Sequence, residues 1–203
     1  MKQSGQGRAV LESLLEGNRA FREGQGPAIA DRAEIARLCN EGQRPRAAVL
    51  CCSDSRVTPE LVFCQGLGQI FSIRTAGNVV SDFERGSVEY AVADLGARLV
   101  LVMGHSGCGA VAGALQGKGN GCMKRVLSQI APSVEQAIRQ AALPEQVAEQ
   151  AENFNILSSL ALLRADPVLA SVPDLTFAAA KYNTQTGEVT LLQVNEPENS
   201  KAC

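Results

Sequence analysis

The 203-residue chain contains no tryptophan and a single histidine, and aromatic residues make up only 4% of it. So few rings leave no platform on which bases of single-stranded nucleic acid could stack, which disfavours that class of binding protein. The chain also lacks an excess of one charge, because 19 basic residues balance 21 acidic ones to a net charge of −2. Without a block of like charges, we expect neither a nucleic acid nor a membrane surface as a partner.

No apolar run approaches the length that spans a membrane, and the first 25 residues lack the apolar core of a secretory signal. We therefore expect a cytoplasmic protein. The length suits a single domain over residues 1–203, with a helical arm over 1–40 and a loose tail over 195–203.

Seven cysteines are scattered through the chain, an odd number that favours metal or catalytic use plus plain buried thiols over a disulfide framework. Cys39 falls in a short helix expected over 31–39, where a core thiol is the simplest interpretation. No role is assigned to Cys64, Cys122 or Cys203, and no Cys-x-x-Cys pair supports a thiol redox protein.

Apolar periodicity alternates between strand and helix, which predicts an α/β fold with a mostly parallel central sheet flanked by helices. The expected strands cover residues 47–52, 69–74, 99–103, 176–182 and 188–192. The expected helices cover residues 8–23, 31–39, 59–63, 84–95, 110–115, 122–140 and 144–164. The last two strands flank a turn over 183–187, so we expect a hairpin that gives the sheet an antiparallel C-terminal edge.

Two of these helices carry apolar stripes. In the helix over 144–164 the stripe consists of Val147, Ala151, Phe154, Leu157 and Ala161. The extended N-terminal helix over 8–23 has its own stripe, and we expect it to pack on a partner subunit.

The only histidine, His105, follows the buried strand 99–103, and small residues then allow a sharp turn to Cys108. Open α/β sheets place their ligands at such a carboxyl end of a strand. His-x-x-Cys supplies two ligands that suit zinc, although a hydrogen-bonded structural histidine would also explain His105.

A second motif, Cys52-Ser53-Asp54-Ser55-Arg56, follows the strand over 47–52. If the two strands are neighbours, Cys52 joins His105 and Cys108 in a set of three ligands, which leaves the open fourth position of a catalytic zinc. Asp54 and Arg56 can form a bidentate ion pair that keeps the carboxylate ionised. An ordinary loop salt bridge is the alternative interpretation.

The two motifs, with His105 lying 53 residues after Cys52, resemble those of the β-class carbonic anhydrases. The resemblance extends to the leading Leu-Leu-Glu-Gly-Asn-Arg-Ala-Phe helix, the 74–78 loop and the Glu-Tyr-Ala-Val helix. It implies one Zn²⁺ per chain, held by Cys52, His105 and Cys108 with water or hydroxide as the fourth ligand. It also implies the reversible hydration of carbon dioxide to bicarbonate and a proton.

The resemblance assigns catalytic roles to Asp54 and Arg56. Asp54, held by Arg56, would orient the zinc hydroxide, and in a closed low-pH state it would become the fourth zinc ligand. One subgroup has an inhibitory bicarbonate pocket that uses a Trp three residues before the first zinc cysteine. Val49 holds that position here, so we expect no such pocket and a site that is open at neutral pH. The same motif leaves Cys51 as a core residue, because neighbouring strand residues point to opposite faces.

The resemblance also implies substrate-binding roles. Gln43, Phe71 and Tyr90 match positions that line the carbon dioxide pocket, and the backbone near Gly109 would add an N–H group. Family members build the site at a dimer interface, so we expect a homodimer or tetramer. Plain packing is the alternative for the two rings.

Two other functions are compatible with the same residues. A hydrolase of carbonyl sulfide or carbon disulfide would use the same ligands, and a non-catalytic zinc module for assembly would need no Asp–Arg pair. For a hydratase, two thiolates donate more charge than imidazoles would, so we expect activity to rise towards alkaline pH.

Overall fold

The computed structural model describes residues 5–28 and 30–195 and contains a five-stranded sheet in the order β2-β1-β3-β4-β5. The strands are β1 (Ala47–Cys52), β2 (Ile70–Thr75), β3 (Leu99–His105), β4 (Thr176–Tyr182) and β5 (Val189–Asn195). Neighbouring strands are parallel from β2 to β4, and only β5 runs antiparallel to its neighbour. The predicted α/β fold with an antiparallel C-terminal edge is therefore confirmed.

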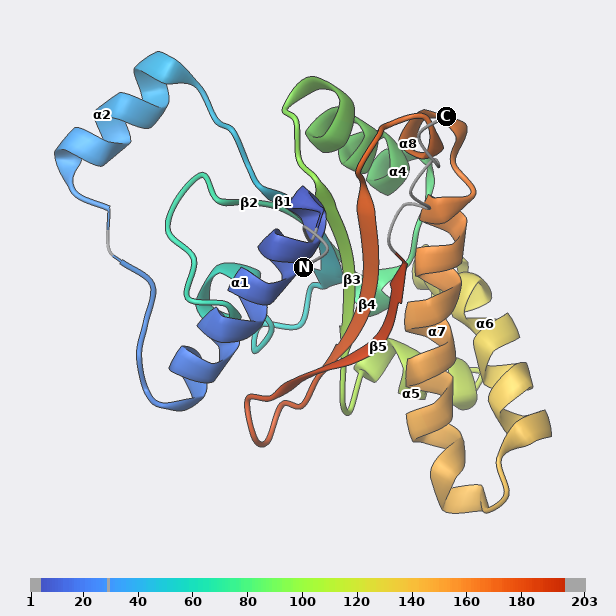
Figure 1. Ribbon diagram of the computed structural model, residues 1–203. Helices are drawn as coiled ribbons and strands as arrows, with labels where there is room; N and C mark the ends of the chain where they lie inside the picture. Colours follow the sequence, from blue (N-terminus) through green and yellow to red (C-terminus); the bar gives the residue numbers. More distant parts are fainter. Residues whose placement is uncertain (1–4, 29, 196–203) are drawn as a thin grey trace.

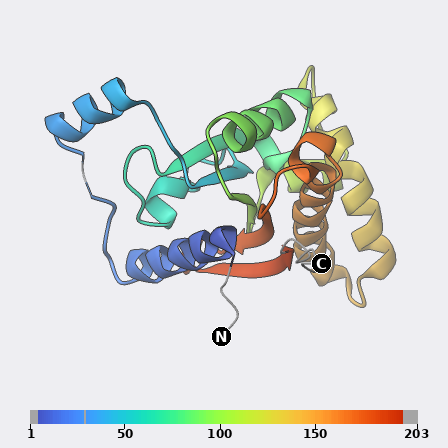
Figure 2. The same ribbon diagram turned by 45° about the horizontal axis from the view of Figure 1, so that its top comes forward.

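Helices cover both faces of this sheet (Figures 1 and 2). One face carries α1 (Gln6–Arg22) and α3 (Pro59–Val62). The other carries α4 (Asp82–Glu89) with the π-helical turn Tyr90–Asp94, α7 (Val147–Arg164) and α8 (Pro167–Ala170). Beyond the carboxyl end of the sheet, α5 (Gly109–Leu115) and α6 (Met123–Gln140) pack beside α7.

The central strands are buried on both sides, which explains their unbroken apolar runs. Val49 and Leu101 face the α1 layer, whereas Leu50 and Val102 face the α7 layer. Cys51 accordingly lies in the α1-side core, as predicted, and its neighbour Cys52 belongs to the separate cluster beside α5 and α6.

The first helix packs on its own chain. Its apolar stripe enters the core beside the sheet, and Asn18 is buried at its end. The Asn18 amide donates to Val62 O at 3.1 Å and to Gly187 O at 2.9 Å, and its oxygen accepts from Val189 N at 3.0 Å. These bonds tie α1 to α3 and to the C-terminal hairpin, and an additional contact with a partner subunit stays a prediction.

The second helix, α2 (Arg32–Glu41), stands apart from the sheet in both ribbon views (Figures 1 and 2). It is held by local contacts: Asp31 caps it by accepting from Glu34 N at 2.8 Å, and Arg37 pairs with Glu34 and Glu41. None of its side chains is buried. The prediction that Cys39 is a core thiol is therefore wrong, because its side chain is exposed on α2.

The predicted apolar stripe of the long helix is confirmed in part. Ala151 is buried, Val147 and Phe154 pack against the same core cluster and Leu157 packs against another, whereas Ala161 is exposed. The fully buried residues of α7 include polar side chains as well, namely Ala151, Glu152, Asn155, Ile156, Ser159, Leu160 and Leu163. Apolarity alone does not define this face, because three polar side chains turn inward.

Element boundaries otherwise follow the sequence closely. The helix expected over 84–95 begins earlier, at Asp82, because Ser81 and Glu84 form a capping box, and it ends in the π-helical turn before Gly96. The tail was predicted to begin at residue 195, but Asn195 still belongs to β5 and pairs with Phe177. Residues 196–203, including Cys203, lie outside the described residues. Within the described part of the chain, no helix is long and apolar enough to cross a membrane.

Candidate metal centre

Three side chains meet at the carboxyl end of the central strands. Cys52 ends β1 and His105 ends the neighbouring parallel strand β3, so the sheet itself brings them together. Gly107 then adopts a positive φ of 70° and turns the chain so that Cys108 precedes α5. The candidate ligand atoms lie within 4.8 Å of one another, and all three residues are buried.

The hydrogen bond of the His105 ring defines its free nitrogen. Nδ1 lies 3.0 Å from the carbonyl oxygen of Ser106, which can only accept, so the proton belongs on Nδ1. Nε2 is then left with its lone pair, buried and without a hydrogen-bond partner among the described residues. A lone pair beside two thiols fits the donor set of a tetrahedral zinc site with one open position.

The surroundings of the two thiols shift their pKa values in opposite directions. The pKa of Cys52 is lowered because the Cys108 thiol donates a hydrogen bond to it, and His105 and the Gly77 N–H, at 3.4 Å, act in the same direction. The pKa of Cys108 is raised correspondingly, because its proton is held by Cys52. Burial lowers the pKa of His105, but the negative charge of the neighbouring Cys52 outweighs this effect and raises it. A divalent cation could displace these protons and balance the negative charge.

A bidentate ion pair lies next to the cluster. Arg56 Nε donates to Asp54 Oδ1 at 2.9 Å and Arg56 Nη2 to Asp54 Oδ2 at 2.8 Å. These hydrogen bonds hold the pKa of Asp54 well below its usual range. Asp54 Oδ2 also lies 3.8 Å from His105 Nε2, so the carboxylate faces the cluster rather than forming an isolated loop salt bridge. Arg74 fixes the same loop by donating to Asp54 O at 2.8 Å.

The expected substrate-binding residues divide into two groups. Gly109 lies beside Cys108, and as the first residue of α5 its N–H has no acceptor one turn earlier. Gln43 is exposed in the loop before β1, at the opposite end of that strand from Cys52. Phe71 lies near the start of β2, four residues before Thr75, the register partner of Cys52, and thus about 13 Å away along the strand. Its ring contacts the half-exposed Tyr90 edge-on, with centroids 6.0 Å apart.

Within one chain, therefore, Gln43, Phe71 and Tyr90 lie towards the amino ends of the strands and do not reach the cluster. Of the three, only Phe71 and Tyr90 are in contact with each other.

Several residues around the cluster were missed from the sequence. Glu152, Asn155 and Ser159 of α7 all bond to backbone groups of the loops that carry or adjoin the sulfur ligands. Their spacing of three and four residues along an otherwise apolar helix is the signal that could have revealed them.

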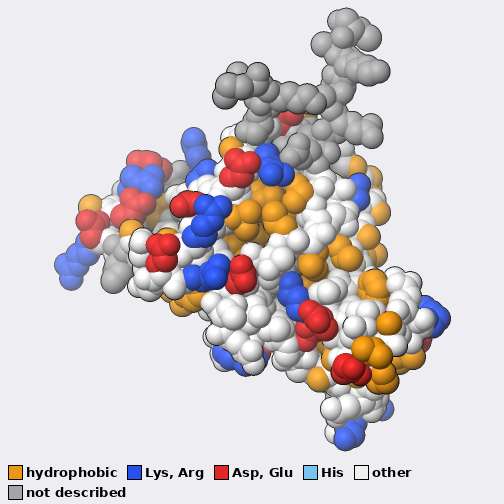
Figure 3. Space-filling model, turned by 60° about the horizontal axis from the view of Figure 1, so that its bottom comes forward, with side chains coloured by type: hydrophobic (Ala, Val, Ile, Leu, Met, Phe, Trp, Pro, Cys, Tyr) orange, Lys and Arg blue, Asp and Glu red, His pale blue; other side chains and the backbone are white. Residues whose placement is uncertain are grey.

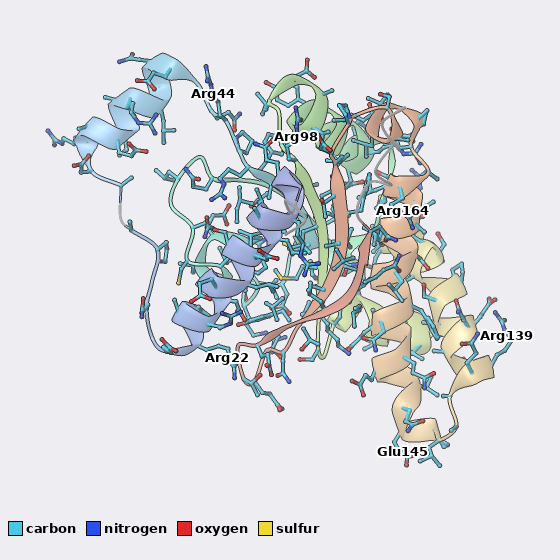
Figure 4. All side chains as sticks on the ribbon, in the orientation of Figure 1. Arg22, Arg44, Arg98, Arg139, Glu145 and Arg164 are labelled. Atoms are coloured by element: carbon cyan, nitrogen blue, oxygen red, sulfur yellow. The ribbon has the colours of Figure 1, made fainter. Side chains whose placement is uncertain are left out.

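The molecular surface agrees with the balanced charge of the sequence. On the face shown in Figure 3, side chains of both signs are interspersed with apolar and neutral atoms. Figure 4 likewise shows Arg22, Arg44, Arg139 and Glu145 projecting outward from separate elements.

Comparison with known proteins identifies the family. Residues 47–189 match the family model described as carbonic anhydrase. The chain belongs to the β-carbonic anhydrase family. It is 40% identical over 135 residues to carbonic anhydrase 2 of Mycobacterium tuberculosis, a match that covers 62% of this chain and 63% of that relative. The chain thus spans less than two thirds of the length of that relative.

Three further matches cover 90% or more of this chain. A carbonic anhydrase of Pseudomonas aeruginosa is 31% identical over 199 residues, covering 90% of this chain and 87% of that protein. The solved structure of the β-carbonic anhydrase CcaA superposes with a TM-score of 0.74 at 28% identity, covering 95% and 94% of the two chains. The fold is also shared with a chain from tetrameric β-carbonic anhydrases of Sordaria macrospora, with a TM-score of 0.73 at 21% identity and coverage of 93% and 96%.

Proposed function

We propose that this protein catalyses the zinc-dependent, reversible hydration of carbon dioxide to bicarbonate and a proton. The observation that carries the proposal is the buried Cys52–His105–Cys108 cluster, with the lone pair of His105 Nε2 left without a partner among the described residues. This cluster lies in a chain of the β-carbonic anhydrase family, whose members depend on zinc.

The three residues of the cluster would hold one Zn²⁺ through two thiolates and His105 Nε2. When bound, zinc lowers the pKa of its water from about 15.7 towards about 7 and so supplies a nucleophile near neutral pH. Asp54 stays ionised because Arg56 Nη2 donates to its Oδ2, and the same oxygen lies 3.8 Å from His105 Nε2, where it could accept a hydrogen bond from a group beside the metal. In this way the pair would orient a hydrogen-bond donor beside the metal. At low pH Asp54 could itself occupy the fourth position on the metal.

The substrate pocket in this proposal is completed by a second subunit. Gly109 contributes its N–H beside Cys108. Gln43, Phe71 and Tyr90 of the same chain lie towards the opposite end of the sheet, near the amino ends of the strands. In a homodimer or tetramer these three would face the cluster of a neighbour, giving an amide for substrate oxygens and two rings for a dry wall. The exposure of Tyr90, 47% in the single chain, supports this arrangement, as does the tetrameric state named for the Sordaria macrospora structures.

We also propose a cytoplasmic location, because the six cysteines in the described residues are all free thiols. Free thiols are typical of a reducing compartment.

Stopped-flow measurement of carbon dioxide hydration between pH 6.5 and 9, on zinc-loaded protein, tests the proposed reaction. We expect rapid turnover that rises towards alkaline pH. Zinc-loaded protein without turnover would contradict the proposal. Hydrolysis of carbonyl sulfide or carbon disulfide by the same sample would then identify the sulfur-substrate alternative, and inactivity towards all three would identify an assembly module.

A further inference from the structure

We propose that the buried polar stripe of α7, formed by Glu152, Asn155 and Ser159, positions both sulfur ligands and thereby sets the metal affinity of the site. The inference deepens the proposed function, because it rests on a metal bound at Cys52, His105 and Cys108. It assigns positioning roles, since none of the three residues is itself a candidate ligand.

Glu152 holds the loop that carries Cys108. Its Oε1 accepts from Gly107 N at 2.7 Å and from Cys108 N at 3.2 Å, so one carboxylate oxygen binds two successive amides. Gly107 has a positive φ, and the second of the two amides belongs to the candidate ligand itself. Hydrogen bonds from amides to a carboxylate are charge-assisted and stronger than those to a neutral acceptor. Glu152 therefore fixes the direction in which the Cys108 side chain leaves the backbone.

Lys181 reduces the energetic cost of burying this carboxylate beside two thiolates. Its Nζ lies 2.8 Å from Glu152 Oε2, and the two side chains are only 13% and 10% exposed. A buried, unpaired carboxylate would be costly and would add negative charge next to the sulfur ligands. The pairing neutralises Glu152 and orients its other oxygen, Oε1, towards the loop. Lys181 itself is fixed on β4, where it is the register partner of Gly104.

Asn155 and Ser159 hold the opposite loop, which adjoins Cys52. Asn155 Nδ2 donates to Gly77 O at 2.7 Å, and Ser159 Oγ donates to Asn78 O at 2.9 Å. The N–H of Gly77 in turn donates to Cys52 Sγ at 3.4 Å. Because the donor to the thiolate and the acceptor for Asn155 belong to the same residue, a shift of α7 would change the hydrogen bond that Cys52 receives.

One face of α7 thus forms hydrogen bonds with both loops. The three residues recur at intervals of three and four, which places them on one buried face of α7. Close packing keeps this face in register with the sheet, because a Cβ on Gly104 would lie 2.4 Å from Ile156 Cγ1. The spacing between the two sulfur ligands is therefore set by a single rigid element, and not by two independent loops.

The helix provides its own matched controls. Ser158 is exposed next to buried Ser159, and Glu149 is 73% exposed although it also approaches Lys181, at 3.7 Å. We would compare Glu152→Gln, Glu152→Ala and Ser159→Ala with Glu149→Gln, Glu149→Ala and Ser158→Ala in the full zinc-loaded chain. The two readouts are zinc transfer to a chromophoric chelator and the visible spectrum of the cobalt(II)-substituted protein.

We expect Glu152→Ala to weaken zinc binding about 10- to 100-fold, the usual effect of losing a group that supports a metal ligand. Glu152→Gln should recover part of that loss, because its amide oxygen still accepts from the two loop amides. Ser159→Ala should weaken binding by a smaller factor, and both should shift the cobalt bands. The Glu149 and Ser158 variants should match the unsubstituted chain in both readouts.

Zinc release and cobalt spectra that are the same for the Glu152, Ser159 and control variants would overturn the inference. A lower melting temperature with unchanged cobalt bands would also overturn it, because it would show a purely structural role. If Glu152→Ala does not fold, Glu152→Gln and Ser159→Ala decide the question. Failure of the proposed function is distinguishable, since the unsubstituted chain would then bind no zinc, or bind it without turnover.

Discussion

Among single residues, Asp54 has the largest role in the proposed mechanism. Its carboxylate accepts two hydrogen bonds from the Arg56 side chain, and its Oδ2 lies 3.8 Å from His105 Nε2. The pair was visible in the sequence as two charged residues separated by one serine. Its orientation towards His105 was not, because that depends on β1 and β3 being neighbours.

Replacing the carboxylate without changing its shape tests its role. Asp54→Asn should keep zinc and lower carbon dioxide turnover about 100-fold or more, the usual contribution of a positioned acid–base group. Asp174→Asn is a suitable control, because Asp174 is exposed and Asn tolerates its φ of 57°. Stopped-flow rates at matched zinc content measure the effect. Unchanged turnover in Asp54→Asn would remove this residue from the mechanism.

The depressed pKa of Asp54 also links stability to pH. Because Arg56 lowers the folded-state pKa, the pair stabilises the fold above the unfolded value of about 3.9. That contribution is lost as pH falls through the folded-state pKa. Urea unfolding of metal-free wild type and Asp54→Asn between pH 3 and 7 should show a stability difference that shrinks towards acid. A difference that grows on acidification would contradict the assigned ion pair.

Among elements, the strands were predicted well because their signal is local. Leu50 and Val102 belong to continuous apolar runs, and such runs identify strands buried on both faces. Helix faces were harder. The buried face of α7 includes Glu152, whose burial depends on loop amides and on Lys181, residues that are distant in sequence. The prediction of a buried Cys39 failed for a related reason. Its helix, α2, contains apolar residues, but none of the residues of α2 is buried.

Asn18 is the residue that anchors α1, and its removal should be costly. Asn18→Ala leaves Val62 O, Gly187 O and Val189 N without their partner, at roughly 1 kcal/mol for each bond. We therefore expect a loss of about 2–4 kcal/mol in the free energy of unfolding. Asn40→Ala, at an exposed position of α2, is the control and should have little effect. Equal urea midpoints for the two variants would show that α1 is not anchored in this way.

For the whole molecule, the central consequence is that one chain does not assemble the proposed pocket. The metal cluster lies at the carboxyl ends of β1 and β3, whereas Phe71 and Tyr90 meet near the start of β2. The sequence could identify both groups through their motifs. It could not show that they lie at opposite ends of the same sheet, because that separation follows from strand register.

Complementation tests whether the pocket is shared. His105→Ala chains should lack zinc, and Phe71→Ala/Tyr90→Ala chains should lack the pocket wall, so each preparation alone should be nearly inactive. Co-expressed and co-purified mixed oligomers should regain turnover, because one of their sites combines an intact cluster with an intact wall. Mixed oligomers with no more activity than the sum of the two parents would place the wall in the same chain as the cluster.

The most direct test of the account measures zinc content and carbon dioxide hydration on one sample, before chelation, after it and after zinc is restored. We predict one zinc per chain, loss of turnover in step with loss of zinc, and recovery of both on re-addition. Full turnover in the metal-free protein, or one zinc per chain with no turnover, would contradict the assignment of Cys52, His105 and Cys108 to a catalytic zinc centre.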